Sequence, residues 1–407
     1  MAAARLRGKA AEDTVLVINS GSSSIKYQLL ALPSETVLLN GLVEGIGGDS
    51  ARHGYDWLDG SGQRQERILT LPKPDHQQGF SAMSAVLSDT RSVPTVIGHR
   101  VVHGGERFVQ PTRIDPAVLD AIEQLSALAP LHNPANVLGI RVCLELFPQL
   151  PQIAVFDTAF HQTIPAYAHR YAVPEAWYRE FGIRRYGFHG SSHRFVAQKA
   201  ADFLQQPLDT LNLITLHLGN GASASAIANG VCVDTSMGFT PLEGLVMGTR
   251  CGDIDASIAL AVQQKTGMSA AQVDNQLNHC SGLFGMTGTQ DMRTLLKRCE
   301  QGDESADLAF SLYCYRIKKY IGAYLAVLGR VDAIIFTGGV GENAAAIRSR
   351  SCKGLKELGI VIDNDLNNQA VTAAACISQN DSPIRILAIR THEELQIALE
   401  AIALAVS

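Results

Sequence analysis

The chain has 407 residues, of which 46% are hydrophobic and 18% are charged, and its net charge at pH 7 is −5. This composition is typical of a folded globular protein of two or three domains. The slightly acidic balance, with no long basic block, argues against a nucleic-acid partner or an anionic membrane surface. No apolar run approaches the roughly 18 residues that a membrane-spanning helix needs, so no membrane association is expected.

Eight cysteines are scattered along the sequence, and none forms a C-x-x-C pair. This spacing argues against a zinc ribbon and is typical of reduced thiols in a cytoplasmic protein. Residues 1–13 carry basic side chains but lack the apolar segment of a signal peptide. We therefore expect them to form a mobile N-terminal extension.

The first motif lies in residues 15–32, where VLVI and IKYQLLAL flank Asn19-Ser-Gly-Ser-Ser-Ser24. Short branched runs bounded by turn residues predict the two strands of a hairpin. The turn can be ordinary hairpin chemistry, or it can bind phosphate through backbone N–H groups and hydroxyls. It is not a Walker A loop, because no glycine precedes Lys26.

Two later segments repeat this arrangement. Residues 211–230 read as strand, Gly/Asn/Ser turn and strand, and residues 331–350 read as strand, Gly-rich turn and helix. The first two hairpins lie about half a chain apart, which predicts two similar halves. Because strands alternate with helical patterns, the fold class is α/β, and ligands are expected at the carboxyl ends of the strands.

Other elements follow from apolar periodicity and from capping residues. Asp115 before Pro116 is a good helix start, since an Asp N-cap is followed by a first-turn proline. Strands are expected over 95–105 and 152–161, and helices over 116–128, 256–265, 305–328 and 393–406.

Two charged residues belong to apolar strands or follow them directly. Arg100 lies in an otherwise apolar strand, beside His99 and His103, and a buried arginine is either ion-paired or binds an anion. Asp157 ends the run IAVF, where a carboxylate suits metal or phosphate chemistry, although a helix N-cap is the commoner use.

The segment RRYGFHGSSHRF holds His189 and His193 four residues apart. A shared metal would need a helix, and Gly190-Ser191-Ser192 favours a turn instead. We expect His189 to donate a hydrogen bond to an anion. A serine nucleophile is not favoured, because the G-x-S-x-G elbow is missing.

Arg250 lies in the glycine-containing segment MGTRCGDID, and a rigid loop that presents one arginine suits phosphoryl transfer. In THEEL, Glu394 is expected to complete a capping box with Thr391, which leaves Glu393 for a metal ion.

Together these segments carry a family resemblance. INSGSSSIKY, GHRVVHGG, APLHNPAN, FDTAFHQTIP, RRYGFHGSSH, HLGNGAS, TSMGFTPLEGLVMGTRCGDID, DMR, TGGVGEN and THEE occur in the order found in acetate kinases, which the chain resembles from about Thr14 to its C-terminus. Propionate and butyrate kinases share much of this pattern. Three positions depart from it: Cys251 replaces the usual Ser, Ala256 the usual Pro, and His392 the usual Asn or Asp.

The resemblance implies the fold of the acetate and sugar kinase, heat-shock chaperone and actin superfamily. This fold has two ribonuclease H-like domains, which duplicate one βββαβαβα core and flank a nucleotide-binding cleft. The expected boundaries are 14–157 plus 394–407 for the first domain and 158–393 for the second, nucleotide-binding domain. A homodimer is also implied.

The resemblance further implies a role for each matching residue. The catalytic set is Arg100, Asp157, His189 and Arg250. The acyl substrate would be bound by Arg100, Val102, Leu131, His132, Phe188 and Pro241. The nucleotide would be bound by Lys26, His217, Leu218, Gly219, Asn220, Gly221, Asp291, Met292, Arg293, Gly339, Val340, Gly341, Glu342 and Asn343. Asn19 and Glu393 would hold Mg²⁺, for which Mn²⁺ is an expected substitute.

The implied reaction is reversible phosphoryl transfer from ATP to acetate, which gives ADP and acetyl phosphate on a route to acetyl-CoA. A propionate kinase is the first alternative, and Val102 favours acetate over it. An actin-like or chaperone-like ATPase is the second, and such a protein has no need of two arginines that hold a second anion.

Overall fold

The structure, a computed structural model, describes residues 13–406. The expected N-terminal extension therefore falls almost wholly outside the described residues, and Asp13 already belongs to the first strand. The described residues divide into two compact units, residues 13–159 with 393–406 and residues 160–392. Within residues 13–406, no helix combines the length and the apolar character that crossing a membrane requires.

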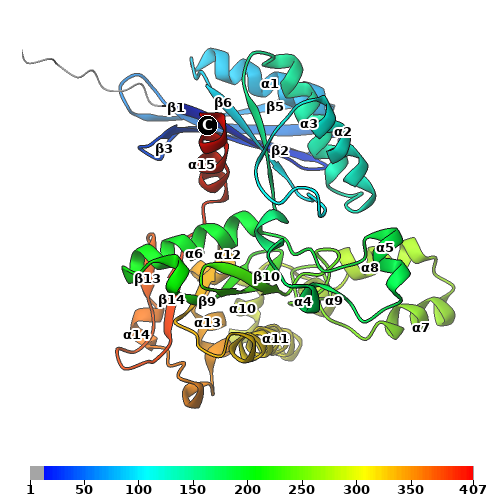
Figure 1. The fold of residues 1–407 in the computed structure, drawn as a ribbon, viewed down its shortest axis with the longest axis vertical. Coiled ribbons are helices and arrows are strands. Elements are labelled where there is room, and N and C mark those ends of the chain that lie inside the picture. Colours follow the sequence, from blue (N-terminus) through cyan, green and yellow to red (C-terminus); the bar gives the residue numbers. More distant parts are fainter. Residues whose placement is uncertain (1–12, 407) are drawn as a thin grey trace, which may run out of the picture. The chain divides into compact units, whose positions relative to one another are not determined.

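The first unit is built on an eight-stranded sheet with the order β5-β4-β3-β2-β1-β6-β8-β7. β1 pairs antiparallel with β2 and parallel with β6, and β6 pairs parallel with β8. The elements, labelled in Figure 1 where there is room, are β1 (Asp13–Ser20), β2 (Ser24–Leu32), β3 (Thr36–Glu44), β4 (Ser50–Leu58), β5 (Arg64–Pro72), α1 (His76–Asp89), β6 (Val96–Val101), β7 (Thr112–Arg113), α2 (Pro116–Gln124), α3 (Asn133–Leu146), β8 (Gln152–Phe156) and α15 (Glu393–Ala405).

Helices cover both faces of this sheet. Ile97 belongs to a core with residues of α1 and α3, whereas a Cβ on the next residue, Gly98, would lie 3.0 Å from Ile397 of α15. Because neighbouring side chains of a strand point to opposite faces, α15 packs against the face opposite α1 and α3. The C-terminal helix thereby returns to the domain with which the chain begins.

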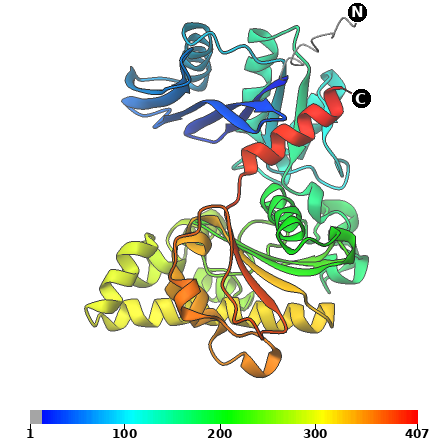
Figure 2. The same ribbon diagram turned by 90° about the vertical axis from the view of Figure 1, so that its left-hand side faces the viewer.

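The second unit has a six-stranded sheet with the order β11-β10-β9-β12-β14-β13. α6 lies along one face of this sheet and α11 along the other (Figures 1 and 2). The elements are α4 (Ala166–His169), α5 (Glu175–Phe181), α6 (Gly190–Leu204), β9 (Asn212–Leu218), β10 (Ala222–Ala228), β11 (Val231–Thr235), α7 (Ser257–Thr266), α8 (Ala270–His279), α9 (Gly282–Thr287), α10 (Met292–Glu300), α11 (Glu304–Leu328), β12 (Ala333–Thr337), α12 (Gly338–Asn343), α13 (Ala345–Cys352), α14 (Asn364–Asn367), β13 (Ala374–Cys376) and β14 (Arg385–Ile389).

The two sheets repeat one topology. The order β3-β2-β1-β6-β8 recurs as β11-β10-β9-β12-β14, with the first three strands antiparallel and the last two parallel to the first. This confirms the α/β class and the duplicated ribonuclease H-like core. The predicted hairpins are confirmed as β1–β2 and β9–β10, and the four predicted helices as α2, α7, α11 and α15.

Two local predictions were wrong. Gly190-Ser191-Ser192 is the first turn of α6 and not a turn between elements, and the Gly-rich segment after β12 forms the helix α12. In α12, Glu342 accepts a hydrogen bond from Gly338 N at 3.0 Å, and Asn343 donates to Gly339 O at 2.9 Å. These side-chain bonds hold residues with poor helix propensity in a helical turn.

Candidate active site

Three polar residues meet at the carboxyl ends of parallel strands in the first unit. Arg100 of β6 donates from Nε and Nη2 to the Asp157 carboxylate at 3.1 and 2.5 Å, and from Nη1 to Asn19 Oδ1 at 3.2 Å. Asn19 belongs to β1, and Asp157 directly follows β8. The strand ends thus assemble a guanidinium, a carboxylate and an amide, as the strand pattern predicted. Of the two uses expected for a buried arginine, an ion pair or an anion site, the ion pair is present at Arg100.

A second carboxylate acts on the same arginine. Burial opposes the charge of Arg100, but the carboxylates of Asp157 and Glu393 outweigh it and raise the pKa of the guanidinium. Burial raises the pKa of Glu393, while the charge of Arg100 acts in the opposite direction. Arg100, Asp157 and Glu393 therefore form one electrostatically coupled group.

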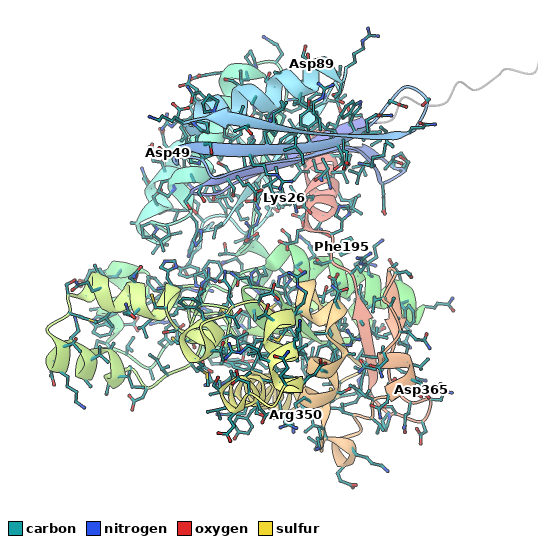
Figure 3. All side chains as sticks on the ribbon, turned by 180° about the vertical axis from the view of Figure 1, so that it is seen from behind. Lys26, Asp49, Asp89, Phe195, Arg350 and Asp365 are labelled. Carbon is teal, nitrogen blue, oxygen red and sulfur yellow. The ribbon has the colours of Figure 1, made fainter. Side chains whose placement is uncertain are left out.

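In the first turn of α15, Glu394 does not make the helix-capping contact that the sequence predicted. This residue forms an ion pair with Lys26 of β2, which is labelled in Figure 3. α15 begins at Glu393, so Thr391 is not its N-cap, and the expected capping box from Thr391 to Glu394 is wrong. The side chain of Thr391 instead bonds Ser192 Oγ at 2.8 Å. Lys26 is thereby tied to the start of the C-terminal helix.

The residues expected to border the acyl group in the first unit differ in exposure. Val102 is 7% exposed, and its backbone N–H donates to Asn136 Oδ1 at 3.1 Å. Leu131 is 56% exposed, and His132 stands at the N-cap of α3. Of these three side chains, only Val102 is fixed by packing.

In the second unit, the tip of the β9–β10 hairpin approaches two cationic or polar side chains. A Cβ on Gly221 would lie 3.4 Å from His189 Nε2 and 3.6 Å from Arg250 Nη1. The loop that carries Arg250 is held against the tip of this hairpin, because Gly248 N donates to Asn220 O at 2.9 Å. A Cβ on Gly248 would lie 2.1 Å from Asn220 Oδ1, so a larger residue there would displace the Asn220 side chain. His189, Gly221 and Arg250 therefore converge.

Arg250 has no carboxylate partner among the described residues. Its Nη1 lies 3.4 Å from Pro241 O and 3.8 Å from Met247 Sδ. Burial lowers the pKa of this guanidinium, and no neighbouring anion compensates. A half-buried arginine in this state has the charge and the geometry to bind an anionic ligand.

His189 is oriented by its neighbours. It caps α6 with a positive φ of 57°, and its ring stacks on that of His217 with centroids 4.3 Å apart. Its Nδ1 lies 2.8 Å from Ser223 Oγ. The preceding Phe188 is buried, and its carbonyl accepts a hydrogen bond from His161 Nε2 at 2.9 Å.

The expected nucleotide residues of the later segments are placed as follows. Asp291 is the N-cap of α10 and forms an ion pair with the exposed Arg293. The Glu342 carboxylate accepts from the backbone N–H groups of Gly338 and Thr391. Both carboxylates thus have structural partners. Glu342 and Asn343 also line a cavity of about 520 Å³.

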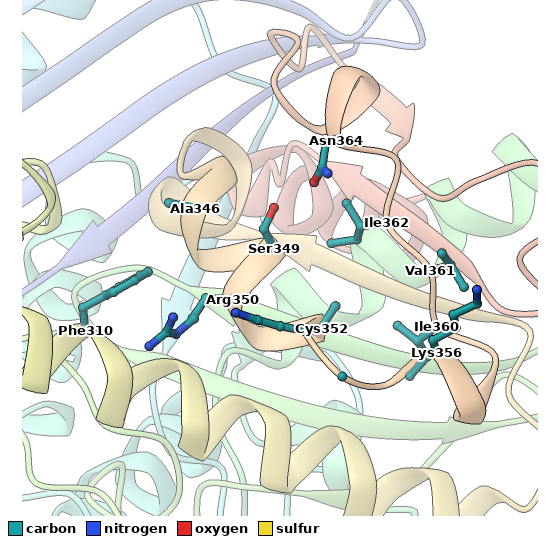
Figure 4. A pocket seen from close by; sticks show the side chains of 12 residues that line it. Phe310, Ala346, Ser349, Arg350, Cys352, Lys356, Ile360, Val361, Ile362 and Asn364 are labelled. Atoms are coloured by element: carbon teal, nitrogen blue, oxygen red, sulfur yellow. The ribbon is translucent and has the colours of Figure 1, made fainter. Parts of the chain in front are cut away.

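A second cavity of about 500 Å³ lies elsewhere on the second unit, between α11, α13 and the segment that follows α13 (Figure 4). None of the sequence-predicted site residues lines it. Its walls are Phe310, Ala346, Ser349, Arg350, Cys352, Lys353, Gly354, Lys356, Ile360, Val361, Ile362 and Asn364.

The donor set of the first unit fits a hard divalent cation. Within residues 13–406, no group of three or more His, Cys, Asp or Glu side chains is arranged as a complete metal site. Mg²⁺ does not need one, since it is commonly held by one or two carboxylates together with substrate phosphates and water. Asp157 and Glu393, both coupled to Arg100, supply such carboxylates.

Sequence reasoning missed a set of buried hydroxyl residues behind His189. Ser223 of β10 bonds both His189 and His193, and Thr215 of β9 bonds His193. The only sequence signal was a serine at an inward position of a strand beside a Gly-rich turn.

Comparisons with known proteins agree with one another. The model of the acetokinase family matches residues 14–399. An acetate kinase of Syntrophobacter fumaroxidans is 51% identical over 394 residues, which are 95% of this chain and 96% of that relative. The crystal structure of Porphyromonas gingivalis acetate kinase has a TM-score of 0.90 at 40% identity, and covers 96% of this chain and 99% of its own. A propionate kinase from Francisella tularensis has a TM-score of 0.91 at 40% identity, with coverage of 96% and 99%.

Proposed function

The chain belongs to the acetokinase family, and we propose that it transfers the terminal phosphoryl group of ATP to acetate in one direct, in-line and reversible step that needs Mg²⁺. The enzyme is a kinase, that is, a phosphotransferase with a carboxylate as acceptor. The single observation that carries the mechanism is Arg250, a half-buried guanidinium beside His189 that has no carboxylate partner among residues 13–406.

The chemistry requires positive charge more than a base. A carboxylic acid has a pKa near 4–5, as Asp and Glu do, so acetate is ionised at pH 7. The difficulty is the approach of this anion to the phosphates of ATP. Arginine suits the task because its planar fork matches the oxygens of carboxylate and phosphate groups. We assign Arg100 and Arg250 to the acyl carboxylate and the transferring phosphoryl group, and His189 to a hydrogen bond with the phosphoryl group.

Asp157 has a positioning role in this mechanism. It holds the guanidinium of Arg100 by two hydrogen bonds, and its carboxylate is oriented by the same contact. Together with Glu393 and the Asn19 amide, it would hold Mg²⁺. When bound, Mg²⁺ neutralises phosphate charge. The side chains themselves fix where the acyl group and the phosphates lie.

Nucleotide binding is assigned to the second domain, residues 158–393. Gly221 of the hairpin tip lies close to Arg250, which supports a role of Gly219-Asn220-Gly221 in holding phosphate. The cavity beside Glu342 and Asn343 supports a further contact with the nucleotide.

The acyl group is proposed to be acetate because Val102, which is packed and nearly buried, limits the space beside Arg100. Propionate is the second candidate, since a propionate kinase has nearly the same fold. One methylene is worth only about 1–3 kcal/mol in an apolar pocket, so propionate should be a slower substrate and not an excluded one.

We also propose a homodimer and a cytoplasmic location. The second unit exposes large apolar side chains, among them Tyr167, Phe181 and Leu260, which an interface would cover. All eight cysteines are free thiols, which supports a reducing compartment. Acetyl phosphate made there would feed acetyl-CoA synthesis.

The mechanism is tested with ATP that is chiral at the γ-phosphorus. Inversion of configuration in acetyl phosphate supports the direct step, whereas retention indicates a phosphoenzyme and overturns it. In the same preparation, ATP turnover should depend on a short carboxylate. Turnover that ignores acetate would instead favour an actin-like or chaperone-like ATPase.

A further inference from the structure

A continuous chain of buried side chains leads from the core of the second unit to His189. Thr215 Oγ1 lies 2.7 Å from His193 Nδ1, His193 Nε2 lies 2.8 Å from Ser223 Oγ, and Ser223 Oγ lies 2.8 Å from His189 Nδ1. The three inner residues come from β9, α6 and β10, which are neighbouring elements (Figure 1). Each of them is 0% exposed.

His193 is neutral in this chain. Burial holds its pKa well below the ordinary value, and the nearby rings of His161 and His217 act in the same direction. A neutral imidazole has one N–H donor and one bare nitrogen acceptor. Each serine or threonine hydroxyl has a single proton to donate. The three hydrogen bonds that link Thr215, His193, Ser223 and His189 can therefore all run toward His189 or all run toward Thr215.

In the outward direction, Thr215 donates to His193 Nδ1, His193 Nε2–H donates to Ser223, and Ser223 donates to His189 Nδ1. Each of the three protons that Thr215, His193 and Ser223 donate then has an acceptor. In the inward direction, His193 donates to Thr215, and the Thr215 hydroxyl proton needs another acceptor. Thr215 Oγ1 has no second hydrogen-bond partner within residues 13–406. Since a buried donor without an acceptor is destabilising, the outward direction is favoured.

We infer that Thr215, His193 and Ser223 form a relay of positioning residues that holds His189 with its proton on Nε2. This inference rests on the proposed role of His189, and it adds the origin of its hydrogen-bond donor. With Nδ1 occupied as an acceptor, the N–H of His189 is on Nε2, the atom that faces Gly221 and the Arg250 side of the hairpin. The side chain is then ready to donate to the phosphoryl group without a change of tautomer.

The relay also explains why a serine occupies position 223. Only a residue with one donor and at least one acceptor can serve both histidines at once. Alanine at this position would leave His189 Nδ1 and His193 Nε2 without their shared partner. The ring of His189 would still stack on His217, but its tautomer would no longer be set.

The test is the two-bond ¹H–¹⁵N spectrum of the full-length enzyme labelled at histidine, with His189 assigned from the His189→Gln variant. The wild type is expected to show a bare Nδ1 and a protonated Nε2 on His189. A protonated Nδ1 with a bare Nε2 would overturn the inference. This reading needs no active enzyme and no variant of the relay to fold.

The variants test the coupling. Ser223→Ala and Thr215→Val should turn the His189 signal into a mixture of tautomers, and kcat should fall by about 10- to 100-fold, as for other partners that fix a histidine tautomer. Thr215→Ser keeps the hydroxyl and should restore both the signal and most of the rate. A His189 signal that is unchanged in Ser223→Ala would contradict the relay. If His189→Gln itself retains full acetate kinase activity, the proposed role of His189 fails, which is a separate result.

Discussion

Arg100 and Asp157 form a two-pronged ion pair in which the carboxylate is 1% exposed and the guanidinium 19% exposed. The pair joins β6 to the end of β8, so one contact both links two strands and orients the arginine that we propose to be catalytic. Removing either partner should therefore affect stability as well as activity.

Asp157→Ala should lower the free energy of unfolding by about 3–5 kcal/mol, because the guanidinium of Arg100 is left without its main partner. Asp157→Asn keeps the volume and one acceptor oxygen, so it should cost less stability while still abolishing most activity. Urea unfolding of both variants checks the difference. Equal stability of wild type and Asp157→Ala would show that the ion pair does not stabilise the fold.

Arg250→Ala should behave in the opposite way. Within the described part of the chain, residues 13–406, its guanidinium hydrogen-bonds only Pro241 O and Met247 Sδ. The fold should therefore be retained, while kcat should fall by about 10³-fold or more. Arg250→Lys keeps the charge but loses the planar fork, and should recover only part of the rate. Steady-state kinetics beside thermal unfolding would separate the two effects. A variant that loses stability in proportion to activity would argue for a structural role.

Val102→Ala should raise the ratio of kcat/KM for propionate to that for acetate by about 10-fold or more, since space for one methylene is created. Val93→Ala is the matched control, because Val93 is 72% exposed and outside the site. An unchanged ratio in Val102→Ala would remove this residue from the acyl pocket.

The buried His99 predicts a pH effect on stability. Burial holds the pKa of His99 at about 4, although its hydrogen bond to Gln152 acts in the other direction. The unfolded chain protonates this ring near pH 6.5, so its contribution, roughly 3 kcal/mol, is present above pH 6.5 and is lost as the pH falls toward 4. His99→Gln should flatten the decline between these values. The exposed His279→Gln should leave the slope as in the wild type, and an equally steep decline in His99→Gln would be the contrary result.

Gly248→Ala should impair catalysis through the tip of the hairpin beside Arg250. The added Cβ would collide with Asn220 Oδ1, so the Asn220 side chain must leave its position at that tip. Gly322→Ala, in the middle of α11 with open space around it, should instead raise stability by up to about 1 kcal/mol. Kinetics and unfolding of this pair distinguish a local clash from a general intolerance of alanine.

The strand-end logic explains which site residues could be predicted. Asn19 and Asp157 each stand where an apolar run ends, and Arg100 lies near the carboxyl end of an otherwise apolar strand. Parallel pairing of β1, β6 and β8 brings these strand ends together. The repeated hairpin pattern in the sequence likewise predicted that the two sheets share one strand order. Both inferences depend on local patterns and on one general rule of sheet geometry.

Other features depend on contacts between distant segments. Ser223 and Thr215 become partners of His189 and His193 only when α6 packs on the second sheet, and a hydroxyl in a strand gives no local sign of this. The helix α12 is stabilised by the side chain of Glu342, which overrides the turn preference of its glycines. Glu394 forms an ion pair with Lys26, which is more than 360 residues away in the sequence. A capping rule considers only neighbouring residues and cannot predict this pair.

The most direct measurement is acyl phosphate formation, trapped as the hydroxamate, with ATP, Mg²⁺ and acetate, propionate or butyrate in parallel. The proposed function predicts fastest turnover with acetate, slower turnover with propionate, and loss of product when Mg²⁺ is removed. Fastest turnover with propionate or butyrate would keep the phosphoryl chemistry and contradict the acyl pocket. No acyl phosphate with any of the three acids would contradict the proposed function itself.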